Sequence, residues 1–438
     1  MKRTALTVTT QAKYNTVRHL SENRQRRTAK GMRRTTAGAQ AAASVLMALI
    51  LSASCGAAEK PAGDASAKRP SAVEPPLLEK KEPVKTVELT WIDGTEIPLE
   101  GRAFPNAKHP YARLPEEAFS KPDLAKIRSA ITCPAGMCFR FTTDSSVLHV
   151  RWTNGAKPPY GLCNATGILT AGIDIYRLGE DDVWRFWMSG FPRAQTNELK
   201  TSWTPNRPCM IYLPLSSRFE SISIGIQRGA KIMPLGPRKS GVEKPVVVYG
   251  TSMVHGYSSS RPGMIWTSVL SRMLDVPMVN QGYSGNGKLE PSMCDYLAAI
   301  DASAYCFFTW GGQMTVETMR EKTRPFLEKL HRARPGVPIL VGEYYYVVGA
   351  NRLNTTNKKR SFVRELVEEL KADDPQFWRN LYLVRGERLF CEDDDGTVDS
   401  AHFNDRGAYR CAEAFAGVLR EALRDSAATA ASNHAQSF

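Results

Sequence analysis

The second half of the sequence alternates between short apolar runs and longer amphipathic stretches, and this alternation limits the possible folds more than any other feature. The apolar runs are Pro245–Tyr249, Val276–Val279, Ala304–Phe308, Ile339–Glu343 and Leu381–Val384. Helical patterns lie between and after them, near residues 264–274, 316–332, 359–371 and 405–424. Continuous apolar runs are typical of parallel strands buried on both faces. The pattern therefore predicts a three-layer α/β domain with a mostly parallel sheet over residues 244–426.

Residues 86–243 follow a different pattern, in which apolar and polar side chains alternate over short segments. Val87–Trp91, Val147–Trp152 and Ile222–Ile226 each show this period of two. Clusters of Gly, Pro, Asn and Asp separate such segments. Several alternating runs in succession are typical of antiparallel sheets. We therefore expect an all-β domain of the sandwich or jelly-roll class in front of the α/β domain.

The first 55 residues have the order of an export signal. Residues 1–44 hold ten Lys and Arg against the single acid Glu22, the apolar run Val45–Leu51 follows, and small residues lead to Cys55. This order predicts export to the periplasm or cell surface. Three outcomes stay open: a lipid anchor on Cys55, ordinary cleavage, and an uncleaved anchor. Met32 is an alternative start that would give the signal a more usual length.

The basic charge of the chain is concentrated in that signal. The whole chain carries +14, of which +9 lies in residues 1–44, so that only +5 remains for the other residues. This distribution argues against nucleic acid as a partner. Residues 56–85 consist of Ala, Pro, Glu, Lys and Ser with few large apolar groups, and we expect a flexible linker there. Residues 427–438 are expected to form a disordered tail.

Cysteine use is compatible with an oxidising compartment. Apart from Cys55 there are eight cysteines, an even number that permits disulfides. Cys133 and Cys138 are close enough in sequence to close a small loop. No CxxC pair occurs and no histidine has the spacing of a zinc ligand, so neither a structural metal nor a cofactor is predicted.

A serine follows the first apolar run, in the sequence Gly250-Thr-Ser252. Ligands of open α/β sheets bind beyond the carboxyl ends of the strands, where this serine is expected. Ser252 can be a nucleophile, or it can be a turn or N-cap serine. The spacing of its glycines departs from G-x-S-x-G, which disfavours an α/β-hydrolase.

A serine nucleophile needs a base, and the sequence offers two histidines in the α/β domain for that role. His255 lies three residues after Ser252 and is interpreted as a pocket-wall or structural histidine. His402 follows Asp399 by three residues in a loop before the last helix. An aspartate at this distance can hydrogen-bond the imidazole and stabilise its protonated form. The alternative is that Asp399 and His402 are ordinary surface residues.

Three motifs in this order resemble those of the GDSL/SGNH hydrolase superfamily: Gly250-Thr-Ser252, Ser284-Gly-Asn-Gly287 and Asp399-Ser-Ala-His402. The sequence Gly172-Ile-Asp-Ile-Tyr176 resembles the motif of the exported subgroup that has an N-terminal GxDLY β domain. The resemblance extends over about residues 86–424. It implies a flavodoxin-like, three-layer hydrolase domain that attacks esters.

The resemblance also implies roles for individual residues. Ser252 would be the nucleophile, and Asp399 and His402 would complete the triad. The backbone amides of Ser252 and Gly285 would stabilise the oxyanion. Asp174 and Tyr176 are expected to stabilise the β domain or its contact with the hydrolase domain.

One motif departs from the family pattern, because Gln313 stands where the family has an asparagine that donates to the oxyanion. The amide is retained but extended by one bond, about 1.5 Å. Loss of one oxyanion donor costs about 10²- to 10³-fold in rate. The leading expectation is a serine esterase that removes O-acyl groups, acetyl in particular, from carbohydrates or small esters. The alternatives are an inactive carbohydrate-binding surface protein and a lipid-ester hydrolase.

Overall fold

The chain divides into two compact units, Met1–Lys81 and Glu82–Phe438. The computed structural model describes residues of the second unit only: 87–155, 164–310, 314–343, 350–389, 391 and 393–435. The predicted export signal, Cys55, the linker 56–85 and Gln313 lie outside the described residues.

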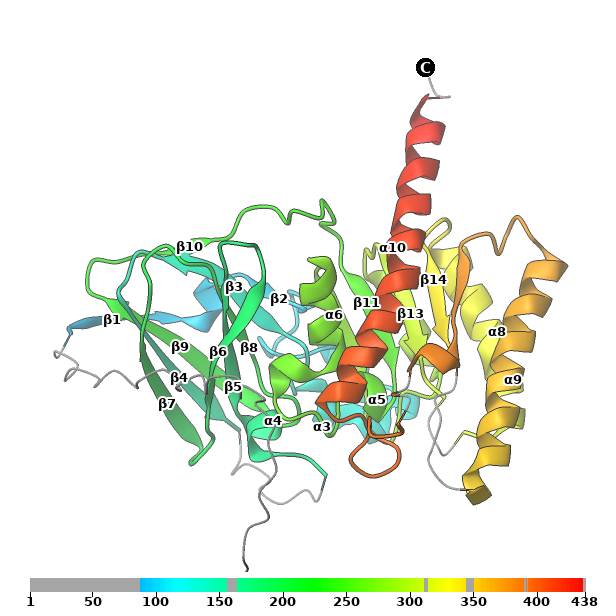
Figure 1. The fold of residues 1–438 in the computed structure, drawn as a ribbon, viewed down its shortest axis with the longest axis horizontal. Coiled ribbons are helices and arrows are strands. Elements are labelled where there is room, and N and C mark those ends of the chain that lie inside the picture. Colours follow the sequence, from blue (N-terminus) through cyan, green and yellow to red (C-terminus); the bar gives the residue numbers. More distant parts are fainter. Residues whose placement is uncertain are drawn as a thin grey trace, which may run out of the picture. The chain divides into compact units, whose positions relative to one another are not determined.

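The first part of the second unit contains two antiparallel sheets (Figure 1). One has the order β1 (Leu89–Asp93), β9 (Phe219–Gln227), β4 (Val147–Asn154) and β7 (Thr196–Ser202). The other has the order β10 (Ile232–Pro234), β3 (Cys138–Thr143), β8 (Cys209–Tyr212), β5 (Ile173–Leu178) and β6 (Trp184–Gly190), with β2 (Leu99–Glu100) paired to β3. Both sheets contribute side chains to one buried cluster, as the alternating pattern requires. The sandwich or jelly-roll class stays a prediction.

The second part contains a five-stranded parallel sheet. Its order is β12 (Met278–Gly282), β11 (Val246–Gly250), β13 (Ala304–Phe308), β14 (Ile339–Gly342) and β15 (Leu381–Val384). All strand pairs within it are parallel. This is the flavodoxin-like order 2-1-3-4-5, in which the order of successive strands across the sheet reverses between β11 and β13. The predicted parallel α/β domain is therefore confirmed.

Helices cover the parallel sheet on both sides. The helices of this part are α5 (Ser252–His255), α6 (Trp266–Leu274), α7 (Pro291–Ala299), α8 (Val316–Ala333), α9 (Ala350–Asp373) and α10 (Asp405–Ala435). Figure 1 shows α6 and α10 on one side of the sheet, with α8 and α9 on the other. Trp266 of α6 packs on Phe415 of α10 with ring centroids 4.7 Å apart.

Shorter helical segments occur in both parts. They are α3 (Arg128–Ile131), α4 (Gly167–Ala171), η1 (Gly94–Glu96), η2 (Glu116–Ser120), η3 (Pro122–Ile127), η4 (Pro262–Met264) and η5 (Gly386–Leu389).

Helix limits differ from the sequence prediction in three places. Helix α7 was not expected, and α9 begins at Ala350 rather than near residue 359. The segment expected to be a disordered tail continues α10 up to Ala435. That segment contains several alanines, which have the highest helix propensity, and they extend the preceding amphipathic helix.

The hydrophobic core of the parallel sheet includes residues from the first part of the chain. Side chains between Ala107 and Ile131, among them Leu114, Leu124 and Ile127, are buried in the same cluster as strands β11 to β15. The sequence boundary at residue 244 thus separates the sheets but does not separate their cores.

The described cysteines are buried in these cores as free thiols. They are Cys133, Cys138, Cys209, Cys294, Cys306, Cys391 and Cys411. The small loop suggested for Cys133 and Cys138 is not closed by a disulfide, because Cys138 lies within β3 while the Cys133 thiol donates to the carbonyl of Ser129.

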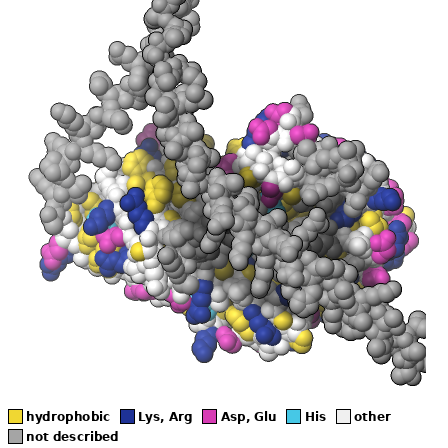
Figure 2. Space-filling view, turned by 90° about the horizontal axis from the view of Figure 1, so that it is seen from below, with side chains coloured by type: hydrophobic (Ala, Val, Ile, Leu, Met, Phe, Trp, Pro, Cys, Tyr) yellow, Lys and Arg dark blue, Asp and Glu magenta, His cyan; other side chains and the backbone are white. Residues whose placement is uncertain are grey.

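Two further properties concern the described residues as a whole. None of their helices is long and apolar enough to span a membrane. On the face in Figure 2, Lys and Arg side chains are interspersed with Asp and Glu.

Candidate active site

Ser252 lies at the carboxyl end of β11, where the strand turns directly into a helix. Thr251 is the N-cap residue and Ser252 the first residue of α5. Gly250 permits the end of β11 to lie close to β13, since a Cβ atom there would lie 2.1 Å from the carbonyl oxygen of Phe308. The serine therefore lies beyond the carboxyl end of β11, at the point where the strand order reverses, as the sequence predicted.

The structure brings Ser252, His402 and Asp399 together. The Oγ of Ser252 lies 2.8 Å from Nε2 of His402, and Nδ1 of His402 lies 2.8 Å from Oδ2 of Asp399. Both distances are those of hydrogen bonds. His402 and Asp399 belong to the loop that precedes α10. Residues 150 positions apart in sequence thus form one hydrogen-bonded chain from hydroxyl to carboxylate.

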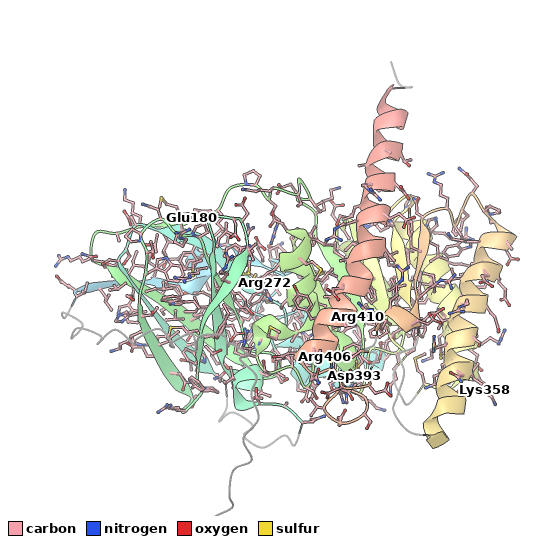
Figure 3. All side chains as sticks on the ribbon, in the orientation of Figure 1. Glu180, Arg272, Lys358, Asp393, Arg406 and Arg410 are labelled. Carbon is pink, nitrogen blue, oxygen red and sulfur yellow. The ribbon has the colours of Figure 1, made fainter. Side chains whose placement is uncertain are left out.

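The loop that carries His402 is fixed by its own contacts. Oδ1 of Asp399 accepts hydrogen bonds from the backbone amides of Ala401 at 3.1 Å and His402 at 2.8 Å. Val398 and His402 are joined through a backbone hydrogen bond of 2.9 Å. Arg406 in the first turn of α10 donates to Asp393, near the beginning of the same loop, at 2.6 Å (Figure 3).

Asp399 is held in its charged form. Burial raises its pKa, but hydrogen bonds from the backbone and imidazole of His402 and from the amide of Asn164 outweigh this effect and lower the pKa to about 2. A charged Asp399 accepts from Nδ1 of His402 and leaves Nε2 free to accept the proton of the serine hydroxyl.

The turn after β12 lies beside the serine turn. The amide of Tyr283 donates to the carbonyl of Gly250 at 2.9 Å, which joins the two turns. Gly285 has φ +73°, and a Cβ atom there would meet no atom within 4 Å, so its backbone borders open space. The amide of Gly285 has no acceptor among the described residues. Together with the amide of Ser252, which begins α5, it is available to an anionic oxygen.

Two side chains, those of Glu290 and Arg113, hold this second turn. Glu290 accepts from the amides of Gly287 at 3.1 Å and Lys288 at 3.0 Å. Arg113, which is fully buried, donates to the carbonyl of Gly282 at 2.5 Å and to that of Ala130 at 2.8 Å. Its guanidinium also lies over the ring of Tyr283, 4.3 Å from the centroid. Arg113 was not predicted from the sequence, because nothing in a single arginine indicates which turn it will contact.

His255 takes no part in this arrangement. Its Nε2 donates to the carbonyl of Leu215 at 3.0 Å, and the side chain is buried. Burial, assisted by the charge of Arg113, lowers its pKa to about 3, so the ring is neutral.

The residues of the GxDLY-like motif lie at the contact between the two parts of the unit. Asp174 is fully buried and accepts from Ser189 at 2.6 Å, Gly263 N at 2.8 Å and Arg261 at 3.0 Å. Arg261 also donates to the hydroxyl of Tyr176 at 2.6 Å. This agrees with the contact role expected from the sequence.

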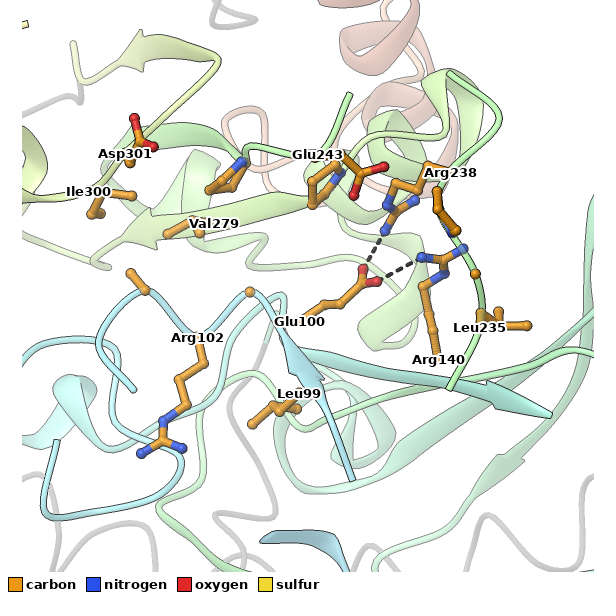
Figure 4. A pocket seen from close by; sticks show the side chains of 16 residues that line it. Leu99, Glu100, Arg102, Arg140, Leu235, Arg238, Glu243, Val279, Ile300 and Asp301 are labelled. Carbon is orange, nitrogen blue, oxygen red and sulfur yellow. Dashed lines mark hydrogen bonds and ion pairs between the residues drawn. The ribbon is translucent and has the colours of Figure 1, made fainter. Parts of the chain in front are cut away.

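Two cavities have no triad residue in their lining. One of about 520 Å³ is lined by residues before β11 and β12, such as Pro245 and Pro277, and so opens at the opposite end of the sheet (Figure 4). Its acid Glu100 is paired with Arg140 and Arg238. A second cavity of about 680 Å³ is lined in part by Asp405 and Tyr409 of α10. Within the described residues, no group of His, Cys, Asp and Glu side chains is arranged to hold a metal ion.

Two family models match the chain. Residues 243–420 match the GDSL-like lipase/acylhydrolase family, and residues 89–232 match the N-terminal GxDLY region of SGNH-hydrolase-type esterases. No curated protein matches the sequence.

Solved structures show the same arrangement of both parts. A putative GDSL-like lipase from Bacteroides ovatus is 28% identical, with a TM-score of 0.68, over 77% of this chain and 98% of that chain. The salicylyl acyltransferase SsfX3 from a tetracycline biosynthetic pathway is 19% identical, with a TM-score of 0.58, over 75% and 95%. A family two carbohydrate esterase from Cellvibrio japonicus is 11% identical, with a TM-score of 0.50, over 77% and 98%. The last two similarities establish a shared fold.

Proposed function

Because the chain belongs to the SGNH hydrolase superfamily, in the group with an N-terminal GxDLY domain, we propose that it is a serine esterase that removes acetyl groups from carbohydrates or small esters. The observation that carries this proposal is the chain of two 2.8 Å hydrogen bonds from Ser252 through His402 to Asp399. The fold shared with a carbohydrate esterase supports a carbohydrate substrate. Export, with or without a lipid anchor on Cys55, is part of the same proposal.

The reaction would proceed through an acyl-enzyme. The Oγ of Ser252 attacks the ester carbonyl while Nε2 of His402 accepts its proton. The amides of Ser252 and Gly285 donate to the oxygen that becomes negative in the tetrahedral intermediate. His402 then returns the proton to the departing alcohol, which leaves an acyl group on Ser252. A water molecule, deprotonated by His402, releases the acid and restores the serine.

Asp399 would act on His402 and not on the ester. Its carboxylate selects the tautomer with the proton on Nδ1 and stabilises the imidazolium that forms during each proton transfer.

Hydrolysis of p-nitrophenyl acetate tests the proposal. We expect the purified protein to hydrolyse it, and Ser252→Ala to lower kcat by at least about 10³-fold. Ser292→Ala is the control. This serine lies on α7, and its hydroxyl donates to Asp123 of η3 at 2.8 Å rather than to a triad residue. Activity that survives in Ser252→Ala would refute the assignment of the nucleophile.

A substrate series then tests the acyl and alcohol groups. Faster release of acetate from acetylated xylan than of palmitate from p-nitrophenyl palmitate would support the proposal. The opposite order would favour a lipid-ester hydrolase. Equal background rates for wild type and Ser252→Ala would favour a carbohydrate-binding protein, the alternative that Gln313 raised.

A further inference from the structure

The segment Asn164–Thr166, which leads from the first antiparallel sheet into α4, contacts the loop that carries the triad acid and base. The side-chain amide of Asn164 donates to Oδ2 of Asp399 at 2.9 Å. The same oxygen accepts from Nδ1 of His402 at 2.8 Å. Asn164 is therefore directly bonded to the atom that orients the imidazole.

A second set of hydrogen bonds ties the same segment to the other end of the loop. The hydroxyl of Thr166 donates to the carbonyl of Ser260 at 2.6 Å. The amide and hydroxyl of Ser260 in turn donate to Asp405, the first residue of α10, at 2.7 and 2.5 Å. Thr166 also caps α4 by accepting from Leu169 N at 3.0 Å, which fixes the segment itself.

Without Asn164, all the donors to Asp399 among the described residues would come from its own loop. Its other donors are the amides of Ala401 and His402 and the imidazole of His402. All of these lie within three residues of Asp399, so they move with the loop. Asn164 is the described donor that comes from another part of the chain, 235 positions away in sequence.

We propose that Asn164 is a positioning residue for Asp399, and that the N-terminal β-rich region thereby completes the catalytic site. The amide satisfies the second lone pair of Oδ2 and keeps the carboxylate aimed at Nδ1 of His402. This inference rests on the proposed esterase function. The side-chain amide of Asn164 is neutral and does not titrate. The titratable group that contacts Asp399 is His402, and His402 in turn faces Ser252 and the ring of Tyr257, whose centroid is 6.3 Å away.

Two substitutions of nearly the same size distinguish positioning from packing. Asn164→Leu removes the donor, and we expect kcat for p-nitrophenyl acetate to fall about 10-fold, the size of a hydrogen bond to a charged group, with KM within about twofold. Asn164→Asp preserves the shape of the side chain but places a carboxylate beside Asp399. At about pH 8, where the new carboxylate is charged, the loss in Asn164→Asp should exceed that in Asn164→Leu.

Asn380→Ala is the control. It removes a side-chain amide that donates to the carbonyl of Gly336 at 2.8 Å, at the amino end of β15. We expect its kcat to stay within about twofold of wild type. Thermal unfolding of all three variants measures any effect on folding.

The relative loss of kcat in Asn164→Leu and Asn164→Asp tests whether Asn164 positions Asp399. A milder loss in Asn164→Asp than in Asn164→Leu would show that Asn164 only fills space, and both variants within twofold of wild type would show that it has no role; either result overturns the inference. If wild type and Ser252→Ala have the same rate, the esterase proposal itself fails, which is a separate result.

Discussion

The carboxylate of Asp174 accepts a hydrogen bond from the backbone amide of Gly263 at 2.8 Å, across the contact between β5 and η4. The same oxygen of Asp174 lies 3.0 Å from Arg261, and Ser189 donates to the other oxygen at 2.6 Å. A buried carboxylate with three donors thus joins the antiparallel sheets to the segment that follows the nucleophile turn.

This contact predicts a large effect of Asp174→Ala on stability. The substitution leaves Arg261 without its buried partner, and we expect the free energy of unfolding to fall by about 3 to 5 kcal/mol. Asp181→Ala is the matched control, because Asp181 pairs with Arg185 at 2.6 Å on the surface, and its loss should change the free energy of unfolding far less. Urea unfolding followed by tryptophan fluorescence measures both. Equal losses in the two variants would contradict the prediction.

Asp399→Asn should lower kcat by about 10³- to 10⁴-fold while the fold is retained. The asparagine can donate to Nδ1 of His402, which selects the wrong tautomer for proton transfer at Nε2. The measurement is the steady-state rate with p-nitrophenyl acetate, together with circular dichroism. A variant with more than a tenth of the wild-type kcat would show that Asp399 is not needed.

The same carboxylate predicts the shape of the acid limb of activity. Because the pKa of Asp399 is about 2, its carboxylate stays charged in moderately acidic solution, and its protonation should not contribute to any loss of activity there. The slope of a plot of log kcat/KM against pH should therefore not exceed one between about pH 4 and pH 6. A slope of two over that range would show that Asp399 titrates there as well.

The lowered pKa of the buried His255 predicts that the folded protein loses stability in acid. Its pKa is lowered to about 3 in the folded protein, below the usual 6.5, so the unfolded chain binds more protons between these values. Stability should fall as pH drops below about 6.5, by up to about 1.4 kcal/mol for each pH unit from this group. In His255→Gln that contribution should disappear, and it is measured as the difference between the two unfolding curves from about pH 6 to pH 4. Parallel pH dependences in wild type and variant would contradict the prediction.

The side-chain amide expected at the oxyanion, that of Gln313, should contribute measurably to kcat. If the longer side chain donates to the oxyanion, Gln313→Ala should lower kcat by about 10²- to 10³-fold with a small change in KM. Gln313→Glu, which keeps the shape but loses the donor, should be at least as damaging. Unchanged kcat in both variants would show that Ser252 and Gly285 are the operative donors.

The sequence predicted the parallel sheet because each of its strands is an apolar run bounded by polar residues. It also predicted which residues meet at the candidate site, because motif order and the rule for carboxyl ends of strands both concern positions along the chain. Helix α7 was missed because its apolar residues follow a much weaker helical period than those of α6, which is equally short and was predicted.

Asn164 and Arg113 were missed for a different reason. Both lie in irregular segments, where no periodicity indicates burial, and both act on partners more than 160 positions away. Their roles depend on how the two parts pack together, and a polar residue in a loop carries no sign of that packing.

The side chains between Ala107 and Ile131 that enter the core beneath β11 to β15 limit how this protein can be divided. A shortened polypeptide that starts at Lys244 would expose to solvent the apolar surface that those side chains cover. It should aggregate rather than refold. Transfer of the hydrolase domain to another protein would therefore have to include this upstream segment as well.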